Sequence, residues 1–108
     1  MENIIGKLEA LRALVQAKQK QGLLDKGYTL EFHPHEVRIK VGRKYANIDV
    51  GGPHWSGCYM VELDTGNIYG IKAYGVIHRG HAYGTLETIN DYDWRGYRAV
   101  RTAQRVAA

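Results

Sequence analysis

The sequence predicts an α+β fold in which an N-terminal helix packs on an antiparallel sheet of about four to five strands. Two observations lead to this prediction. Apolar residues recur at helical spacing near the N-terminus, and from residue 28 onward they alternate with polar residues along several short segments. Short antiparallel strands behind one helix are typical of the α+β class. We therefore expect one domain over residues 1–108, a length that supports a modest hydrophobic core.

The first element, residues 1–22, is predicted to be an amphipathic helix. Its apolar side chains share one stripe, which we expect to face the core: Ile4, Ile5, Leu8, Leu11 and Val15. Gly22 is the predicted end of this helix, because glycine favours helix C-termini.

The antiparallel sheet is predicted over residues 28–73. It begins with the segment YTLEFH, in which Tyr28, Leu30 and Phe32 share one face. Further inward rows are expected along four more strands: Val37, Ile39 and Val41; Ala46, Ile48 and Val50; Tyr59, Val61 and Leu63; Tyr69 and Ile71.

Glycines at positions 70, 75, 80 and 84 favour sharp bends, so residues 74–93 are predicted to form an irregular Gly/Tyr-rich loop. This loop carries His78, Arg79 and His81, between Tyr-Gly pairs at Tyr74 and Tyr83. Side chains on loops are free to meet a partner, so we expect function here.

The last element, residues 94–108, is predicted to be a basic helix. The spacing of its arginines lines them along one side: Arg95, Arg98, Arg101 and Arg105. The chain has a net charge of +4, and the whole excess falls in this segment, because every acidic residue lies at or before Asp93. Such a segment suggests an acidic partner, with nucleic acid the commonest candidate.

The histidines offer only an incomplete metal site. His33 and His35 flank Pro34, which interrupts a strand, and His78 with His81 lacks an evident third ligand. We therefore expect no bound metal, no cofactor and no catalytic residue. A small metal-dependent or general-base enzyme built on His78 and His81 is kept as a further alternative.

Side chains that stack on bases or fill protein pockets are concentrated after residue 53, Trp55 among them. Half of the tyrosines could equally form the core of a small protein that is poor in Phe. From this set the predicted binding residues are Tyr74, His78, Arg79, His81, Tyr83, Trp94, Arg95, Arg98, Arg101 and Arg105.

Residues 59–97 resemble a group of small uncharacterised proteins of phages, prophages and other mobile elements. The resemblance rests on the run TGNIYGIKAYGVIHRGHAYGTL, residues 65–86, and on YDWRGY, residues 92–97. It implies a small accessory protein acting in a bacterial cytoplasm, and it transfers no catalytic residue.

The leading hypothesis is a non-enzymatic binding protein of phage or mobile-element origin, whose target is a nucleic acid or a nucleoprotein. The alternative is a protein-binding inhibitor of a host defence effector, such as a CRISPR complex. We expect no membrane association, because no apolar run approaches the roughly 20 residues that a spanning helix needs. A homodimer is left open.

Overall fold

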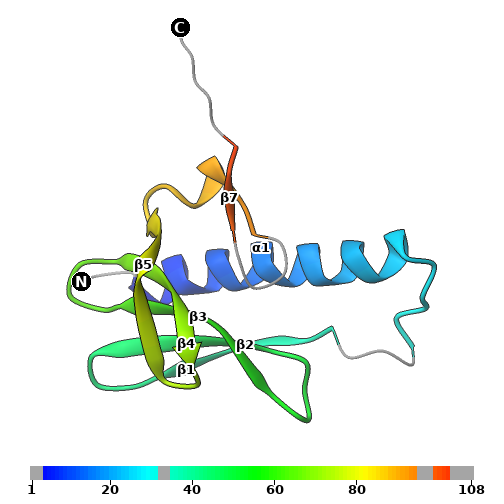
Figure 1. Ribbon diagram of the computed structural model, residues 1–108, viewed down its shortest axis with the longest axis horizontal. Coiled ribbons are helices and arrows are strands. Elements are labelled where there is room, and N and C mark those ends of the chain that lie inside the picture. Colours follow the sequence, from blue (N-terminus) through cyan, green and yellow to red (C-terminus); the bar gives the residue numbers. More distant parts are fainter. Residues whose placement is uncertain (1–3, 32–34, 95–98, 103–108) are drawn as a thin grey trace, which may run out of the picture.

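The computed structural model describes residues 4–31, 35–94 and 99–102. One long helix, α1 (Ile4–Asp25), precedes a five-stranded antiparallel sheet made of β1 (Val37–Val41), β2 (Tyr45–Val50), β3 (Ser56–Glu62), β4 (Asn67–Ala73) and β5 (Val76–Thr85). A short 3₁₀ helix, η1 (Ile89–Asp91), then leads into a small pair of strands, β6 (Tyr92–Asp93) and β7 (Val100–Arg101). Figure 1 shows α1 lying along one side of the sheet. The predicted α+β class, with an N-terminal helix on an antiparallel sheet, is confirmed.

The hydrophobic core lies between α1 and the sheet. Leu8, Leu11 and Val15 of the predicted stripe are fully buried, whereas Ile5 is 61% exposed. They join a cluster of strand side chains, which includes Ala46, Ile48, Val50, Tyr59, Val61 and Ile68. The C-terminal part of α1 contributes no buried residue and extends beyond the strands (Figure 1). Packing therefore fixes the first half of the helix.

The helix continues through Gly22, its predicted end, as far as Asp25. Gly27 follows with a φ of +85°, and the Tyr28 N–H donates to the Leu23 carbonyl at 3.0 Å. This is a Schellman motif, which satisfies carbonyls left open at a helix C-terminus. The predicted strand from Tyr28 is therefore wrong over residues 28–31, and residues 32 and 33 lie outside the described part of the chain.

The register of the sheet separates two faces. The strand order is β1-β2-β3-β4-β5. Ile39 pairs with Ile48, and Ile48 with Tyr59, on the face that packs against α1. Arg38 pairs with Asp49, so by alternation both side chains belong to the opposite face, which we call the outer face. Tyr69 pairs with Met60 and also lies on the outer face, which corrects the prediction that it points inward.

Most of the predicted loop at residues 74–93 is strand. Tyr74 and Gly75 form a two-residue turn, in which Gly75 has a φ of +79°, and β5 then pairs with β4. Three residues, Arg79 to His81, are inserted between the pairs Gly70–His78 and Tyr69–Ala82. The glycines that favour a loop in the sequence thus serve a turn and a wide bulge within one long hairpin.

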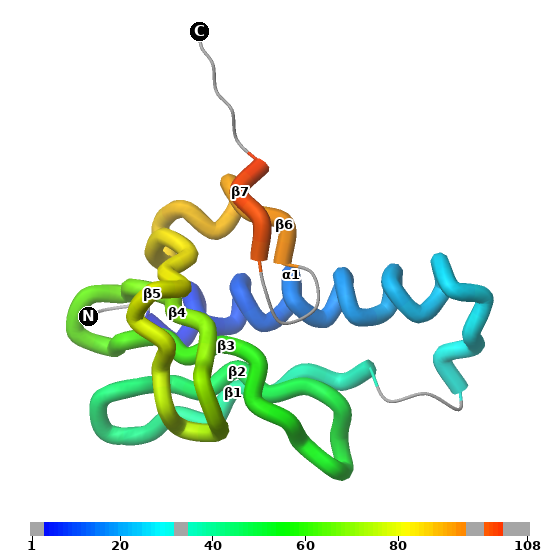
Figure 2. Tube along the Cα trace, in the orientation of Figure 1, coloured from blue at the N-terminus to red at the C-terminus, as the bar shows by residue number. Residues whose placement is uncertain are grey.

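The predicted C-terminal helix is wrong where the structure describes the segment, because Val100 and Arg101 form strand β7 against β6. The apolar side of the predicted helix consists mostly of alanine, so it offers little apolar surface for packing against the rest of the protein. The segment is instead anchored by Trp94 and Ala99, which are buried. Figure 2 shows β6 and β7 side by side, above α1 in this view, and Trp94, which follows β6, packs its ring against Tyr59 of β3. Residues 95–98 and 103–108 lie outside the described residues.

No helix in the described ranges combines the length and the apolar character needed to cross a membrane.

Candidate functional site

Two of the predicted binding residues are core residues. Trp94 is 1% exposed, and its Nε1–H donates to the Ile89 carbonyl at 2.8 Å. Tyr83 is 7% exposed, and the rings of both residues pack edge-on against Tyr59, with centroids 5.2 Å and 5.6 Å away. Such contacts add specific geometry to apolar burial. The structure therefore places Tyr83 and Trp94 where they stabilise the fold.

The two histidines of β5 are neighbours. The rings of His78 and His81 stack with centroids 3.9 Å apart and planes 3° from parallel, and the Gly80 N–H donates to His78 Nδ1 at 3.2 Å. An imidazole binds a metal ion in the plane of its ring, and two parallel stacked planes share no such point. This arrangement would have to open before both rings could bind one ion. No group of three His, Cys, Asp or Glu side chains suited to a metal occurs among the described residues.

The remaining predicted binding residues are divided between two sides of the molecule. Tyr74 and Arg79 lie on the sheet hairpin, and both are exposed. Arg101 is exposed on β7, which Figure 1 shows beyond α1, on the opposite side from the β4–β5 turn. Arg95, Arg98 and Arg105 lie outside the described residues. Arg101 and the exposed residues of the Gly/Tyr-rich segment thus do not form one continuous surface in the described structure.

A buried carboxylate organises the outer face. Asp49 is fully buried, and its Oδ2 accepts hydrogen bonds from Arg38 Nε at 2.9 Å and from the Tyr74 hydroxyl at 3.0 Å. Its other oxygen, Oδ1, has no hydrogen-bond partner among the described residues. The hydrogen bond to Asp49 raises the pKa of Arg38, so the guanidinium stays charged. Asp49 therefore fixes one cation and one aromatic ring in place.

Gly57 makes the contact between Tyr74 and Asp49 feasible. Asp49 is on β2 and Tyr74 follows β4, so the tyrosine must cross β3, where Gly57 pairs with Asp49. A Cβ at Gly57 would lie 2.7 Å from Ile71 Cδ1 and 3.0 Å from Tyr74 Cδ1. Only glycine leaves that space open, and close approach of this kind is a common reason for glycine within a strand.

Cations and aromatic rings are paired on the outer face. Arg38 Cζ lies 4.6 Å from the Trp55 ring centroid, Lys40 Nζ lies 6.0 Å from that of Tyr74, and Arg79 Cζ lies 6.0 Å from that of Tyr69. Such distances allow cation–π attraction. We call this set the outer-face cluster, with Asp49 at its centre: Arg38, Lys40, Asp49, Trp55, Tyr69, Tyr74 and Arg79.

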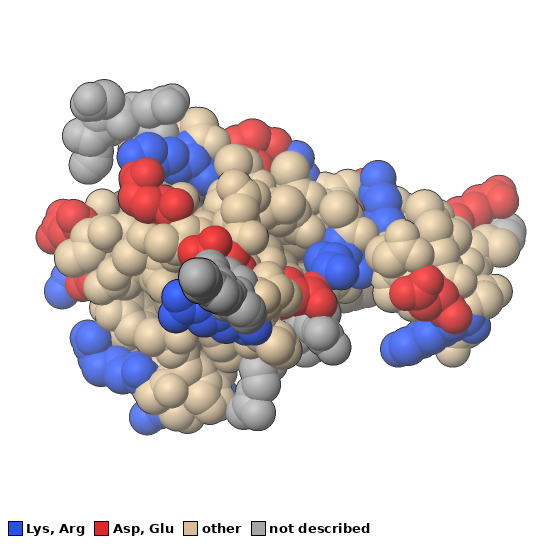
Figure 3. All heavy atoms as spheres, turned by 90° about the horizontal axis from the view of Figure 1, so that it is seen from above, with Lys and Arg blue, Asp and Glu red and all other residues tan. Residues whose placement is uncertain are grey.

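The charges on the helix side are arranged differently. Figure 3 shows basic and acidic side chains interspersed over that side. Lys7 pairs with Glu87, and Lys18 Nζ lies 3.0 Å from Asp93 Oδ1. Each of these two cations has a nearby carboxylate, which reduces what it offers to an anionic partner.

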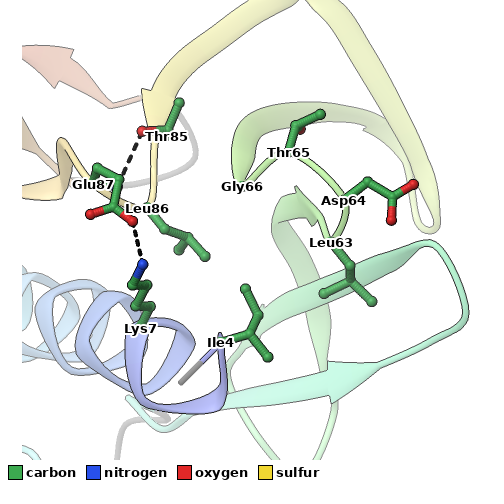
Figure 4. A pocket seen from close by; sticks show the side chains of 9 residues that line it. All are labelled: Ile4, Lys7, Leu63, Asp64, Thr65, Gly66, Thr85, Leu86 and Glu87. Atoms are coloured by element: carbon green, nitrogen blue, oxygen red, sulfur yellow. Dashed lines mark hydrogen bonds and ion pairs between the residues drawn. The ribbon is translucent and has the colours of Figure 1, made fainter. Parts of the chain in front are cut away.

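A cavity of about 140 Å³ lies between the start of α1, the β3–β4 turn and the end of β5. Ile4, Leu63 and Leu86 form its apolar walls, and its lysine, Lys7, is paired with Glu87 (Figure 4). The Asp64 carboxylate points away from this pair in the same view. The cavity is small beside the roughly 300 Å³ or more of a typical ligand pocket, and its cation is already neutralised.

Cys58 lies next to Gly57 on β3 and is 1% exposed. Burial, together with the charge of Asp49, raises the pKa of the Cys58 thiol to about 12. The thiol is therefore protonated at neutral pH, whereas a nucleophilic cysteine reacts as the thiolate. Cys58 serves packing.

Arg38, Lys40 and Asp49 are the residues of the outer-face cluster that sequence analysis does not single out. Their alternation with Val37, Ile39 and Ile48 places them opposite the core, which is the one signal available. That signal does not distinguish them from ordinary solvent-facing residues. The ability of Trp55 to stack follows from its residue type, but its contact with Arg38 depends on the register of β1.

A scan against protein-family models, a search of curated proteins and a search of solved structures found no significant match to this chain.

Proposed function

We propose that this chain is a non-enzymatic nucleic-acid-binding protein of phage or mobile-element origin, and that it contacts its target through the outer-face cluster. The observation that supports the proposal is the set of three cation–aromatic pairs on the sheet face that α1 leaves uncovered. Nucleic acids offer phosphates to cations and bases to aromatic rings, so one surface that carries both suits them.

Preorganisation by Asp49 adds to this support. Its carboxylate neutralises Arg38, whereas Lys40 and Arg79, both exposed, have no ion-pair partner within the described part of the chain. Because Arg38 and Tyr74 are both tied to a buried oxygen, less side-chain freedom is lost when a ligand binds. Lys40 is on β1 and Arg79 is on β5, which are the two edge strands of the sheet. Phosphates could therefore be bound at both edges.

A protein target is the second candidate, in the form of an inhibitor of a host defence effector. Tyr74 and Val76, at the β4–β5 turn, are 49% and 50% exposed. Exposed apolar and aromatic side chains beside arginine are also what protein interfaces use. The two candidates predict different behaviour in salt.

The test is the binding of a fluorescein-labelled oligonucleotide, followed by anisotropy over a series of salt concentrations. Affinity should fall steeply as salt rises, because bound phosphates release counterions. The double variant Lys40→Ala/Arg79→Ala should bind more weakly and lower the slope of log K against log salt by about 1.4 to 1.8, at about 0.7 to 0.9 for each lost phosphate contact.

The matched control is Lys20→Ala/Lys26→Ala, which removes the same charge at the far end of α1 and should leave the slope unchanged. If neither DNA nor RNA binds at low salt, the nucleic-acid proposal is wrong. If the control variant loses as much affinity as the outer-face variant, the interface lies elsewhere.

A further inference from the structure

We infer that the outer face takes single-stranded rather than double-stranded nucleic acid, and that one unpaired base stacks on the ring of Tyr74. This inference rests on the proposed function and specifies its ligand. It follows from the hydrogen bond that holds the Tyr74 ring in place and from the two cations, Lys40 and Arg79, on either side of that ring.

Tyr74 is at once exposed and fixed. It is 49% exposed, yet its hydroxyl donates to the buried Asp49 at 3.0 Å, and one edge of its ring lies over Gly57. An exposed tyrosine ordinarily samples several rotamers, and binding must select one of them. Here the ring is already held, so a base can stack on it without that cost. Aromatic rings presented on a sheet are a recurrent way of binding unpaired bases.

A duplex does not offer what this ring can bind. The flat faces of paired bases are covered by their neighbours, and only base edges are reachable, through the grooves. The elements that commonly read the major groove are a helix or a two-stranded ribbon inserted into it. The long helix α1, which is the kind of element that enters a major groove, lies on the other face of the sheet. On the outer face, Tyr74 offers the flat surface of its ring. Stacking requires a base that has left its own stack.

The cations are placed to hold the backbone of such a strand on both sides of the ring. Lys40 lies on edge strand β1, and its Nζ is 6.0 Å from the ring centroid of Tyr74. Arg79 lies on the opposite edge strand, β5. With five strands spaced about 4.8 Å apart, the sheet is about 19 Å wide. A short single strand that crosses the β-strands would meet both cations and pass over Tyr74 between them.

The experiment compares one labelled strand of about twelve nucleotides, within the site size of single-strand-binding folds, with the same strand annealed to its complement. Anisotropy is measured for both at one salt concentration. The single strand should bind about 5- to 150-fold more tightly, the size of effect expected from stacking one base. A 2-aminopurine in the strand should be quenched on binding, because stacking on an aromatic ring quenches it.

Tyr74→Leu should lower the single-strand affinity about 5- to 150-fold, the range for losing one base–aromatic stack, and should abolish the quenching of 2-aminopurine. Its affinity for the duplex should fall by much less than its affinity for the single strand. Tyr74→Phe keeps the ring and removes the hydroxyl bond to Asp49, so it should keep the quenching and lose only a few-fold in affinity. The control is Tyr28→Leu, since Tyr28 is 48% exposed beyond the end of α1.

Circular dichroism and thermal melting of each variant establish that it is folded before its affinity is compared. Equal affinity for the single strand and the duplex overturns the inference, as does unchanged quenching in Tyr74→Leu. Both of these outcomes leave the proposed function standing. If neither form binds, the proposed function itself is overturned.

Discussion

The Tyr74 hydroxyl donates a 3.0 Å hydrogen bond to Asp49 Oδ2, across the strand that separates the two residues. The same oxygen accepts a hydrogen bond from Arg38, so strands β1 and β2 and the β4–β5 turn meet at one buried carboxylate group. Gly57 leaves the space that this contact needs. The outer face is thus held together by a polar contact, whereas the opposite face is held by apolar packing against α1.

The two partners of the Arg38–Asp49 ion pair should respond differently to substitution. The Asp49 side chain is fully buried and that of Arg38 is 37% exposed. Arg38→Met leaves a buried carboxylate without its cation, whereas Asp49→Asn leaves a cation that water can reach. We expect Arg38→Met to lower the free energy of unfolding at pH 7 more than Asp49→Asn does. Urea denaturation of both variants measures this order, and the reverse order would show that the buried Asp49 carboxylate does not depend on its cation.

Two Tyr-Gly pairs should differ in their sensitivity to a methyl group. Gly75 has a φ of +79° and no described atom near its added Cβ, whereas Gly84 has a φ of +71° and a Cβ that would collide with Thr88 Oγ1. Gly75→Ala should cost about 1 to 2 kcal/mol from backbone strain alone. Gly84→Ala should cost about 1 to 3 kcal/mol more, because the site is overpacked. Chemical denaturation gives both values, and equal losses would show that packing at Gly84 relaxes freely.

Stability should fall in alkaline solution through Cys58. Burial and the charge of Asp49 raise the pKa of this thiol from 9.0 to about 12 in the folded state. Below pH 9 both states are protonated; as the pH rises toward 12, the unfolded state loses the proton and the folded state keeps it. The free energy of unfolding should therefore fall, with a slope approaching about 1.4 kcal/mol per pH unit.

The control for this effect is Cys58→Ala, which should show a shallower fall between pH 9 and 10, a range below the ordinary pKa of 10.0 for tyrosine. Restricting the range keeps the contribution of Tyr59 small, because burial raises the pKa of this tyrosine as well. Denaturation under reducing conditions at several pH values provides the slopes. Identical slopes for the two proteins would mean that Cys58 titrates normally in the folded state.

Two glycines at the end of α1 form a matched pair for backbone effects. Among the described residues, no atom lies within 4 Å of a Cβ added at Gly22 or at Gly27, but Gly27 has a φ of +85° and Gly22 lies inside the helix. Gly22→Ala should raise the free energy of unfolding by about 0.5 to 1 kcal/mol, and Gly27→Ala should lower it by about 1 kcal/mol. Thermal melting should show shifts of opposite sign. Loss of stability in both would show that Gly22 is constrained by something other than its helix.

Much of the fold is predictable from local pattern. The stripe of Leu8, Leu11 and Val15 and the row of Ala46, Ile48 and Val50 are buried as predicted. The ends of the elements are less predictable. The helix α1 continues through Gly22 and ends at Asp25, just before Gly27, which adopts the left-handed conformation. Both glycines follow a helical pattern, and the sequence does not tell which of them adopts a positive φ.

The glycine-rich segment and the C-terminal segment show where local pattern misleads. Residues 76–85 have the glycines of a loop, yet they pair with β4 because that strand offers an open edge. The arginines after Trp94 have the spacing of a helix, but Val100 and Arg101 pair with β6 once Trp94 and Ala99 are buried. In both segments, pairing and burial against distant residues outweigh intrinsic preference.

The sequence by itself determined the α+β class, the helix stripe and the inward rows of β2 and β3, because periodicity is a property of neighbouring residues. Only the tertiary structure decided the outer-face cluster and the burial of Tyr83 and Trp94. Asp49 and Tyr74 stand 25 residues apart and meet because the register of β2 and β3 sets Gly57 beside Asp49. Such a contact follows from the relative positions of whole strands, which no spacing within a single segment encodes.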